Sequence, residues 1–298
     1  MSNKEEPKEI KEFCRTILAL SENAQTDIIL FDADIEKPQD DDLIACCRQP
    51  VYENVLLFLT TMGGDPDIAY RIARYLQEKY QKFTVYIDTY CKSAGTLIAL
   101  GADEVIMADT AELGPLDVQL LKPDELGERD SGLDLIHALG RLKEVSYDVF
   151  EEFFMTLWLK GEGQISTKSA LEVATNVTSG LLNPIYHQIE PMKLGNLYRA
   201  MEIAEEYGDR LNSRDNLKPD ALHRLIYGYP SHSFVIDRRE AEQFIFQSVR
   251  KPKEQEEQVA LHLHKMRQLN DDKDIFISHV TKECLENQDE NEINKRQN

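Results

Sequence analysis

The chain has 298 residues, with 34 lysines and arginines against 54 aspartates and glutamates, and its formal net charge at pH 7 is −20. This acidity argues against a general nucleic-acid binder, which needs a basic footprint, and disfavours electrostatic docking on anionic lipid. The five cysteines are odd in number and lack the spacing of a disulfide framework or zinc site, so we expect reduced thiols and no bound metal.

Neither a secretory signal nor a membrane span is expected. The N-terminal segment MSNKEEPKEIKEF is charged and lacks the apolar stretch of a signal peptide. No apolar run approaches the roughly 20 residues that are needed to cross a bilayer. We therefore expect a cytoplasmic protein.

The N-terminal half predicts alternating strands and helices. An amphipathic stretch at residues 10–20 indicates a short helix or arm, and residues 28–31 (IILF) predict a buried strand. Apolar runs at residues 55–59 and 84–87 flank a helical segment at residues 65–80. This order forms a βαβ unit, for which parallel pairing with a right-handed crossover is expected.

The rest of the chain predicts mainly helices. A short apolar helix at residues 93–101 precedes a strand at residues 104–107. Beyond them we expect helices at 130–160, 165–189, 193–211 and 217–227, and the prolines at 184 and 191 are expected to interrupt the second and third of these. A short strand at 233–236 and helices at 238–248 and 252–269 follow. The tail after residue 283 is polar and acidic, and it is expected to be disordered.

These elements suggest a division of the chain into three parts. Residues 1–25 form an N-terminal arm, and residues 26–250 form the main domain, which carries a helical insertion at about 130–225. Residues 251–298 form a C-terminal helix followed by the acidic tail.

The most informative pattern combines a glycine pair with a serine. Gly63 and Gly64 follow a predicted strand, and Ser93 lies at the start of the short apolar helix. Glycine can present N–H groups freely in a turn, and a helix N-terminus adds unpaired N–H donors. Donors aimed at a developing oxyanion are often the largest catalytic contribution. The pattern indicates that Ser93 is a nucleophile and that Gly63, Gly64 and the N–H of Ala94 form an oxyanion hole. From the residues alone, two simpler explanations remain open: Ser93 as a helix N-cap without a catalytic role, and the glycine pair as a plain turn between a strand and a helix.

Four segments resemble the Clp-protease and crotonase-like superfamily, and within it the signal peptide peptidase A branch and the serine dehydrogenase proteinases. They are TMGGD at 61–65, KSAGT at 92–96, GADEVIMADTAELGPLD at 101–117 and YPSHSFVIDRREAE at 229–242. The resemblance covers roughly residues 25–250. It implies an α/β fold with a Clp-like spiral sheet core, flanking helices and a helical C-terminal half, assembled as a homo-oligomer. Nothing resembles a nicotinamide or pyridoxal site, so no cofactor is expected.

The chain departs from the Clp pattern at the catalytic base. Where Clp proteases have a histidine after the nucleophile, this chain has Leu116. His232 is the first candidate for the base, because it falls where the aspartate of the Clp triad would lie and could reach the space left at Leu116. Asp117 could orient His232. The alternative is a turn histidine without a catalytic role.

A lysine is the competing base, because the peptidase A branch resembles a serine–lysine dyad. Such a lysine must be largely neutral, so burial has to lower its pKa. Lys143 has a spacing from Ser93 like that of short members of the branch, but its surroundings are typical of a solvated helix face. Lys193 is another option, whereas Lys92 is adjacent to the serine, and neighbouring side chains usually diverge.

The resemblance implies a serine peptidase that acts on peptides or unfolded protein segments. The chain contains no nucleotide-binding fingerprint, so a separate ATPase would be needed to unfold folded substrates. Two alternatives remain open. One is an acyl-thioester enzyme of crotonase type, although no basic cradle for coenzyme phosphates is evident. The other is a non-catalytic oligomeric protein that kept the fold and lost the base.

Overall fold

The computed structural model divides the chain into two compact units. One unit is formed by Met1–Leu116 together with Ile203–Asn298, and the other by Asp117–Glu202. The structure describes residues 6–116, 119–121, 129–161, 164–269 and 276–279. The tail after residue 283 lies outside these ranges.

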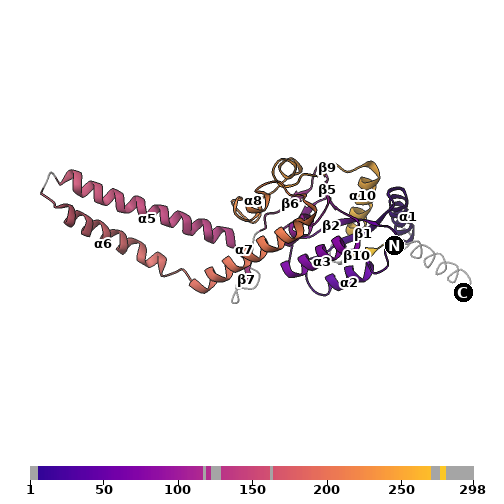
Figure 1. Ribbon diagram of the computed structural model, residues 1–298, viewed down its shortest axis with the longest axis horizontal. Helices are drawn as coiled ribbons and strands as arrows, with labels where there is room; N and C mark the ends of the chain where they lie inside the picture. Colours follow the sequence, from indigo (N-terminus) through magenta and orange to yellow (C-terminus); the bar gives the residue numbers. More distant parts are fainter. Residues whose placement is uncertain (1–5, 117–118, 122–128, 162–163, 270–275, 280–298) are drawn as a thin grey trace, which may run out of the picture. The chain divides into compact units, whose positions relative to one another are not determined.

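A mainly parallel sheet forms the centre of the first unit (Figure 1). Among the described residues it has six strands, in the order β10-β1-β2-β3-β5-β9. Strands β1, β2, β3, β5 and β9 pair in parallel, and β10 pairs antiparallel with β1. The strand bounds are β1 Thr26–Asp32, β2 Asn54–Thr60, β3 Lys82–Ile87, β5 Glu104–Met107, β9 Val249–Arg250 and β10 Phe276–His279. The expected α/β class is confirmed.

Helices bury both faces of this sheet, which explains why its central strands are continuous apolar runs. On one face, α1 (Glu6–Ala24) and α10 (Glu254–Leu269) contribute to a core cluster with strand side chains such as Phe58 and Tyr86. The residues that alternate with these, such as Leu57 and Val85, are buried on the opposite face. The segment predicted as a short helix or arm is thus α1, whose apolar face belongs to the core.

Helix α3 (Pro66–Lys79) begins directly after the glycine pair, and its start has a clear local cause. The carboxylate of Asp65 caps the helix by accepting hydrogen bonds from the N–H groups of Asp67 at 2.8 Å and Ile68 at 3.4 Å. Pro66 occupies the first helical position, where its missing N–H is not needed. The turn that holds the two glycines is therefore fixed at its C-terminal end.

The segment predicted as one helix at residues 238–248 differs in the structure. It begins as α9 (Arg238–Glu240), continues as a π-helical turn (Ala241–Ile245) and enters β9. The Ile245 carbonyl accepts from Lys218 N at 2.8 Å, and Gln247 N donates to the Asn216 carbonyl at 2.7 Å. Backbone groups thus pair with a neighbouring segment, which ends the helix.

The two prolines also behave differently from expectation. Pro184 lies inside α6 (Thr167–Tyr186) near its C-terminal end, so it does not interrupt the helix. Pro191 begins α7 (Pro191–Leu211), a position that proline favours. The predicted strand at 233–236 is reduced to a single β-bridge at Ile236.

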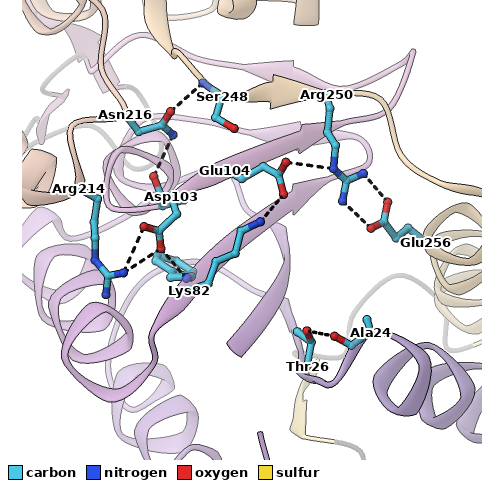
Figure 2. Close-up of polar contacts among 12 residues, drawn as sticks. Ala24, Thr26, Lys82, Asp103, Glu104, Arg214, Asn216, Ser248, Arg250 and Glu256 are labelled. Atoms are coloured by element: carbon cyan, nitrogen blue, oxygen red, sulfur yellow. Dashed lines mark hydrogen bonds and ion pairs between the residues drawn. The ribbon is translucent and has the colours of Figure 1, made fainter. Parts of the chain in front are cut away.

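Polar contacts hold the segment of Arg214 and Asn216, which follows the second unit in the sequence and is called the returning chain here, against the sheet (Figure 2). Arg214 donates to the carboxylate of Asp103 at 3.2 Å. The side chain of Asn216 donates to the carbonyl of Ala102 at 2.9 Å and accepts from the N–H of Ser248 at 2.9 Å. These contacts place the segment that later forms β9 beside β5.

Arg250 then connects three elements (Figure 2). Its guanidinium donates to both carboxylate oxygens of Glu256 on α10, at 2.7 and 2.8 Å, and pairs with Glu104 on β5 at 3.3 Å. Glu104 also accepts from Lys82 on β3 at 3.0 Å. The edge strand, the neighbouring strands and α10 are thus joined by one ionic network.

The second unit contains a short antiparallel hairpin and long helices. Strands β7 (Gln119–Leu121) and β8 (Arg129–Ser131) pair with each other, and α5 (Gly132–Lys160) packs along α6 (Figure 1). Helix α7 begins in this unit. Across the described part of the chain, no helix combines the length and apolarity that a membrane crossing requires.

We predict that Glu256→Gln lowers the free energy of unfolding at pH 7 by about 2 kcal/mol, because it weakens a buried charge-assisted hydrogen bond. Burial alone would raise the pKa of Glu256, but hydrogen bonds from Arg250 and the Lys253 N–H outweigh it and lower that pKa. The carboxylate therefore stabilises the fold above its unfolded pKa of about 4.3, and this contribution disappears as the pH falls through the lower folded value. Urea unfolding of both proteins between pH 7 and pH 3.5 measures this.

The matched control is Glu254→Gln, which removes an exposed carboxylate from the same first turn of α10. This variant should unfold like the parent protein at pH 7. An equal loss of stability in both variants would contradict the role given to Glu256.

Candidate active site

A second, smaller set of strand pairings aligns the segments that lead to Gly63, Ser93 and His232. Strand β4 (Tyr90–Cys91) pairs in parallel with β6 (Glu112–Leu113). Single β-bridges extend this pairing from Thr61 to Cys91 and from Leu113 to Ile236. The register therefore runs Thr61–Cys91–Leu113–Ile236 across four chain segments, and these four residues are all buried.

The direction of each of the four segments determines which of its residues leave the small sheet at the same edge. The first three segments are parallel, so the residues that follow Thr61 and Cys91, including Gly63 and Ser93, leave at the same edge. The segment of Ile236 is antiparallel to β6, so the residues that precede Ile236, including His232, leave at that edge as well. The topology thus directs the glycine pair, the serine and the histidine segment to one edge.

Gly63 lies directly against the predicted nucleophile. A Cβ atom on Gly63 would be 3.0 Å from the Cβ of Ser93 and 3.4 Å from the backbone nitrogen of Ala94. Both glycines have positive φ, +112° at Gly63 and +144° at Gly64, which L side chains rarely adopt. A Cβ on Gly64 would be 2.1 Å from the carbonyl oxygen of Ile35, so this turn admits only glycine without rearrangement.

The three predicted oxyanion donors differ in their surroundings. The N–H of Gly63 donates to the Thr61 hydroxyl at 3.0 Å. Gly64 is exposed, and Ala94 is the first residue of α4 (Ala94–Leu100), where an N–H has no acceptor within the helix. Gly64 and Ala94 are therefore the better candidates for binding an oxyanion, while the Thr61 hydroxyl holds the turn through Gly63.

Ser93 has an unusual backbone at the turn from β4 into α4. Its φ is 48° and its ψ is −113°, although it carries a side chain. Conformations of this kind are strained and cluster at active sites, and a strained serine between a strand and a helix is the arrangement of a nucleophile elbow. Its side chain makes no capping hydrogen bond to α4. The geometry therefore disfavours a simple N-cap.

The segment that carries His232 is fixed on both sides. Ile236 exchanges two backbone hydrogen bonds with Leu113, each of 3.0 Å. Tyr229 donates its hydroxyl hydrogen to Glu240 at 3.0 Å, and Arg238 donates to the carbonyl of Met107 at 2.9 Å. His232 itself is half-buried in the turn between these anchors. Its role as base stays a prediction.

The competing bases lie in the second unit. Lys143 is exposed on α5, and Lys193 is exposed on α7, where it pairs with Glu190 at 2.7 Å. Asp117, the predicted orienting residue, lies outside the described residues.

Two further features bear on the site. Within the described ranges, no group of three or more His, Cys, Asp or Glu side chains is arranged to hold a metal ion.

Lys92 is buried and pairs with Glu112 at 2.9 Å, a contact that nothing in the spacing of these residues indicates. The one sequence signal is Gly114, whose missing Cβ leaves room for the lysine side chain.

We predict that Gly63→Ala destabilises the protein by about 1–2 kcal/mol, because the alanine has to adopt a positive φ beside Ser93. Gly64→Ala should cost more, because its Cβ would collide with a backbone carbonyl. Gly180→Ala serves as the control: it lies inside α6, nothing approaches the position of its Cβ within 4 Å, and a gain of about 0.5–1 kcal/mol is expected. Urea denaturation of the three variants measures the series, and equal losses at Gly63 and Gly64 would contradict the packing described.

Comparisons with known proteins give partial matches in structure and in sequence. Two solved structures of variants of the membrane-bound stomatin-specific protease 1510-N are similar to this chain, one of them in complex with a substrate peptide. The complex has a TM-score of 0.32 and 20% identity, and the match covers 49% of this chain and 64% of that chain. The other has a TM-score of 0.31 and 16% identity, and the match covers 76% of this chain and 97% of that chain.

Two curated relatives come from Methanocaldococcus jannaschii. The uncharacterized protein MJ1495 is 35% identical over 183 residues, which are 58% of this chain and 56% of the relative. The uncharacterized protein MJ0137 is 44% identical over 64 residues, which are 22% of each chain. The chain thus spans about half the length of the first relative and less of the second.

A family model described as "ClpP-like SDH-type serine proteinase" matches residues 33–125. That segment contains the glycine pair, β4, Ser93 and α4, so the match and the geometry concern the same residues. Over residues 33–125, the chain is therefore similar to the ClpP-like SDH-type serine proteinases.

Proposed function

We propose that this protein is a serine peptidase that hydrolyses peptides or unfolded protein segments through an acyl-enzyme on Ser93. The observation that carries the proposal is the packing of the Gly63 turn against Ser93 and Ala94, with Ser93 held at positive φ at the start of α4. A nucleophile and backbone N–H donors are thereby brought next to each other. The match of residues 33–125 to a family model of serine proteinases supports the same function.

In the proposed mechanism, the hydroxyl oxygen of Ser93 attacks the carbonyl carbon of the substrate. The N–H groups of Gly64 and Ala94, with Gly63 in the same turn, stabilise the negative charge that develops on the carbonyl oxygen. A base accepts the serine proton and passes it to the leaving amine. Water then hydrolyses the ester between Ser93 and the acyl group, and the free serine is regenerated.

His232 is the base that we favour. The antiparallel bridge at Ile236 directs its segment to the edge of the small sheet at which Ser93 emerges. Lys193, in contrast, is exposed and pairs with Glu190 at 2.7 Å. Lys143 and Lys193 remain the alternatives, and Asp117 is the proposed orienting group for the histidine.

We also propose a substrate class and a cellular location. A peptide or an unfolded segment can reach a serine at a strand edge without prior unfolding. Folded substrates would need a separate ATPase as partner, and we propose a cytoplasmic location. If the protein is instead an acyl-thioester enzyme or a non-catalytic protein, Ser93 should not react with a fluorophosphonate.

We further propose that the protein is a homo-oligomer. Apolar side chains of the α5–α6 pair are exposed to solvent, among them Trp158, Leu159, Leu181 and Ile185. The end of α6, residues 173–186, contains no charged residue, although the whole chain carries a net charge of −20. Two copies could therefore meet there with little charge repulsion.

We predict that a fluorophosphonate labels Ser93 of the purified protein and that Ser93→Ala abolishes the label. His232→Ala should slow labelling by about 10²–10⁴-fold, the usual contribution of a general base. Lys143→Ala and Lys193→Ala should label at nearly the parent rate. The labelled peptide is identified by mass spectrometry, and the rates come from a time course.

His264→Ala is the matched histidine control, since His264 lies on α10 and pairs with Asp88 at 2.6 Å. If a lysine variant, rather than His232→Ala, abolishes labelling, that lysine is the base. An unlabelled Ser93 in a folded protein would count against the peptidase. Binding of acyl-CoA would then favour the acyl-thioester enzyme, and its absence would favour the non-catalytic protein.

We predict that Leu181→Glu reduces the molar mass measured by light scattering from an oligomer to a smaller species. A carboxylate buried in an apolar contact is strongly unfavourable. Thr167→Glu adds the same charge at an exposed position of α6 outside residues 173–186 and should leave the mass unchanged. A parent protein that is monomeric at every concentration would contradict the proposed oligomer.

A further inference from the structure

We propose that Lys92, through its ion pair with Glu112, holds Ser93 in its strained backbone conformation and is therefore a positioning residue for the nucleophile. This inference rests on the proposed function of Ser93. Lys92 itself is not assigned any contact with substrate.

The first observation is the burial of a charged side chain. Lys92 is only 8% exposed, and its Nζ atom donates to Glu112 at 2.9 Å and to the carbonyl of Leu113 at 3.4 Å. Lysine is almost never buried unless it is paired. Because its partner Glu112 is partly exposed, the ion pair contributes little net stability, and a role in fixing conformation is the more economical explanation.

The second observation is the backbone of Lys92, which is bonded on both sides. Its N–H donates to the carbonyl of Thr61 at 3.0 Å, and its carbonyl accepts from the N–H of Gly95 at 2.8 Å. The same carbonyl oxygen would lie 3.1 Å from a Cβ on Gly63. Lys92 thus joins the strand before the glycine pair, the glycine turn and the first turn of α4.

The third observation is the path of the Lys92 side chain over β6. In the β4–β6 register, Lys92 and Gly114 each follow a paired residue, so they lie on the same face of the small sheet. A Cβ on Gly114 would be 2.9 Å from the Cδ of Lys92, which means that the stem passes directly over the glycine. Thr96 of α4 also donates to the carbonyl of Gly114, at 2.7 Å. The strand under the lysine is therefore tied to the helix that follows Ser93.

Together these contacts explain how the backbone of Ser93 stays strained. A residue in a sparsely populated conformation persists only when its surroundings determine it from several sides. On its C-terminal side, Ser93 is held by α4, whose residue Leu97 donates to the Ser93 carbonyl at 3.2 Å. On its N-terminal side, the anchor is Lys92, whose side chain is fixed by Glu112.

The test compares the full-length protein with Lys92→Met, Glu112→Gln and the double variant. Methionine keeps most of the stem over Gly114 but removes the charge. We expect the maximal rate of fluorophosphonate labelling to fall at least tenfold in each single variant, with no further loss in the double variant and an unchanged apparent inhibitor affinity. Crystal structures should show that the φ of Ser93 moves to a negative value. Lys82→Met, which breaks the pair with Glu104, is the control and should label like the parent.

Each outcome separates this inference from the proposed function. If Lys92→Met and Glu112→Gln keep the parent labelling rate and the positive φ of Ser93, the positioning role is wrong and the peptidase stands. If the parent protein is not labelled but φ changes in the variants, the peptidase is wrong and the backbone role stands. A slower labelling that only follows the fraction of folded protein, with φ unchanged, also overturns the positioning role. Glu112 is partly exposed, so its variant tests the same pair if Lys92→Met fails to fold.

Discussion

The backbone register Thr61–Cys91–Leu113–Ile236 is the constraint on which the candidate site depends. Each member is buried, and each stands a few residues from a group with a proposed role. Without this register, the glycine turn, the serine and the histidine segment would belong to separate parts of the unit. The large sheet supplies the core, and the small pairing directs the glycine turn, Ser93 and the segment of His232 to one edge.

The polar contacts of the site and of the returning chain act in the same way. Buried polar groups have to be paired, so every such pair limits how the backbone can run. Lys92 with Glu112 limits the turn at Ser93, and Asn216 limits the approach of β9 to β5.

The sequence predicts the parallel core because its signals are local. The apolar runs at β1, β2, β3 and β5 are continuous, as expected for strands buried on both faces, and the glycine pair has a local signature. Strands β9 and β10 are short and are formed by pairing with distant segments, so no local periodicity indicates them. The positive φ of Ser93 and the burial of Lys92 likewise arise from tertiary contacts, which residue spacing does not contain.

The chain order of the first unit has a consequence for protein synthesis. The serine and the glycine pair are translated before the second unit, whereas Ile236 and β9 emerge only after it. At ordinary translation rates the interval is on the order of ten seconds. During that time the nascent chain contains Ser93 but lacks Ile236, the bridge partner of Leu113 whose segment carries His232. Under the proposed function, catalytic competence would therefore arise only near the end of translation.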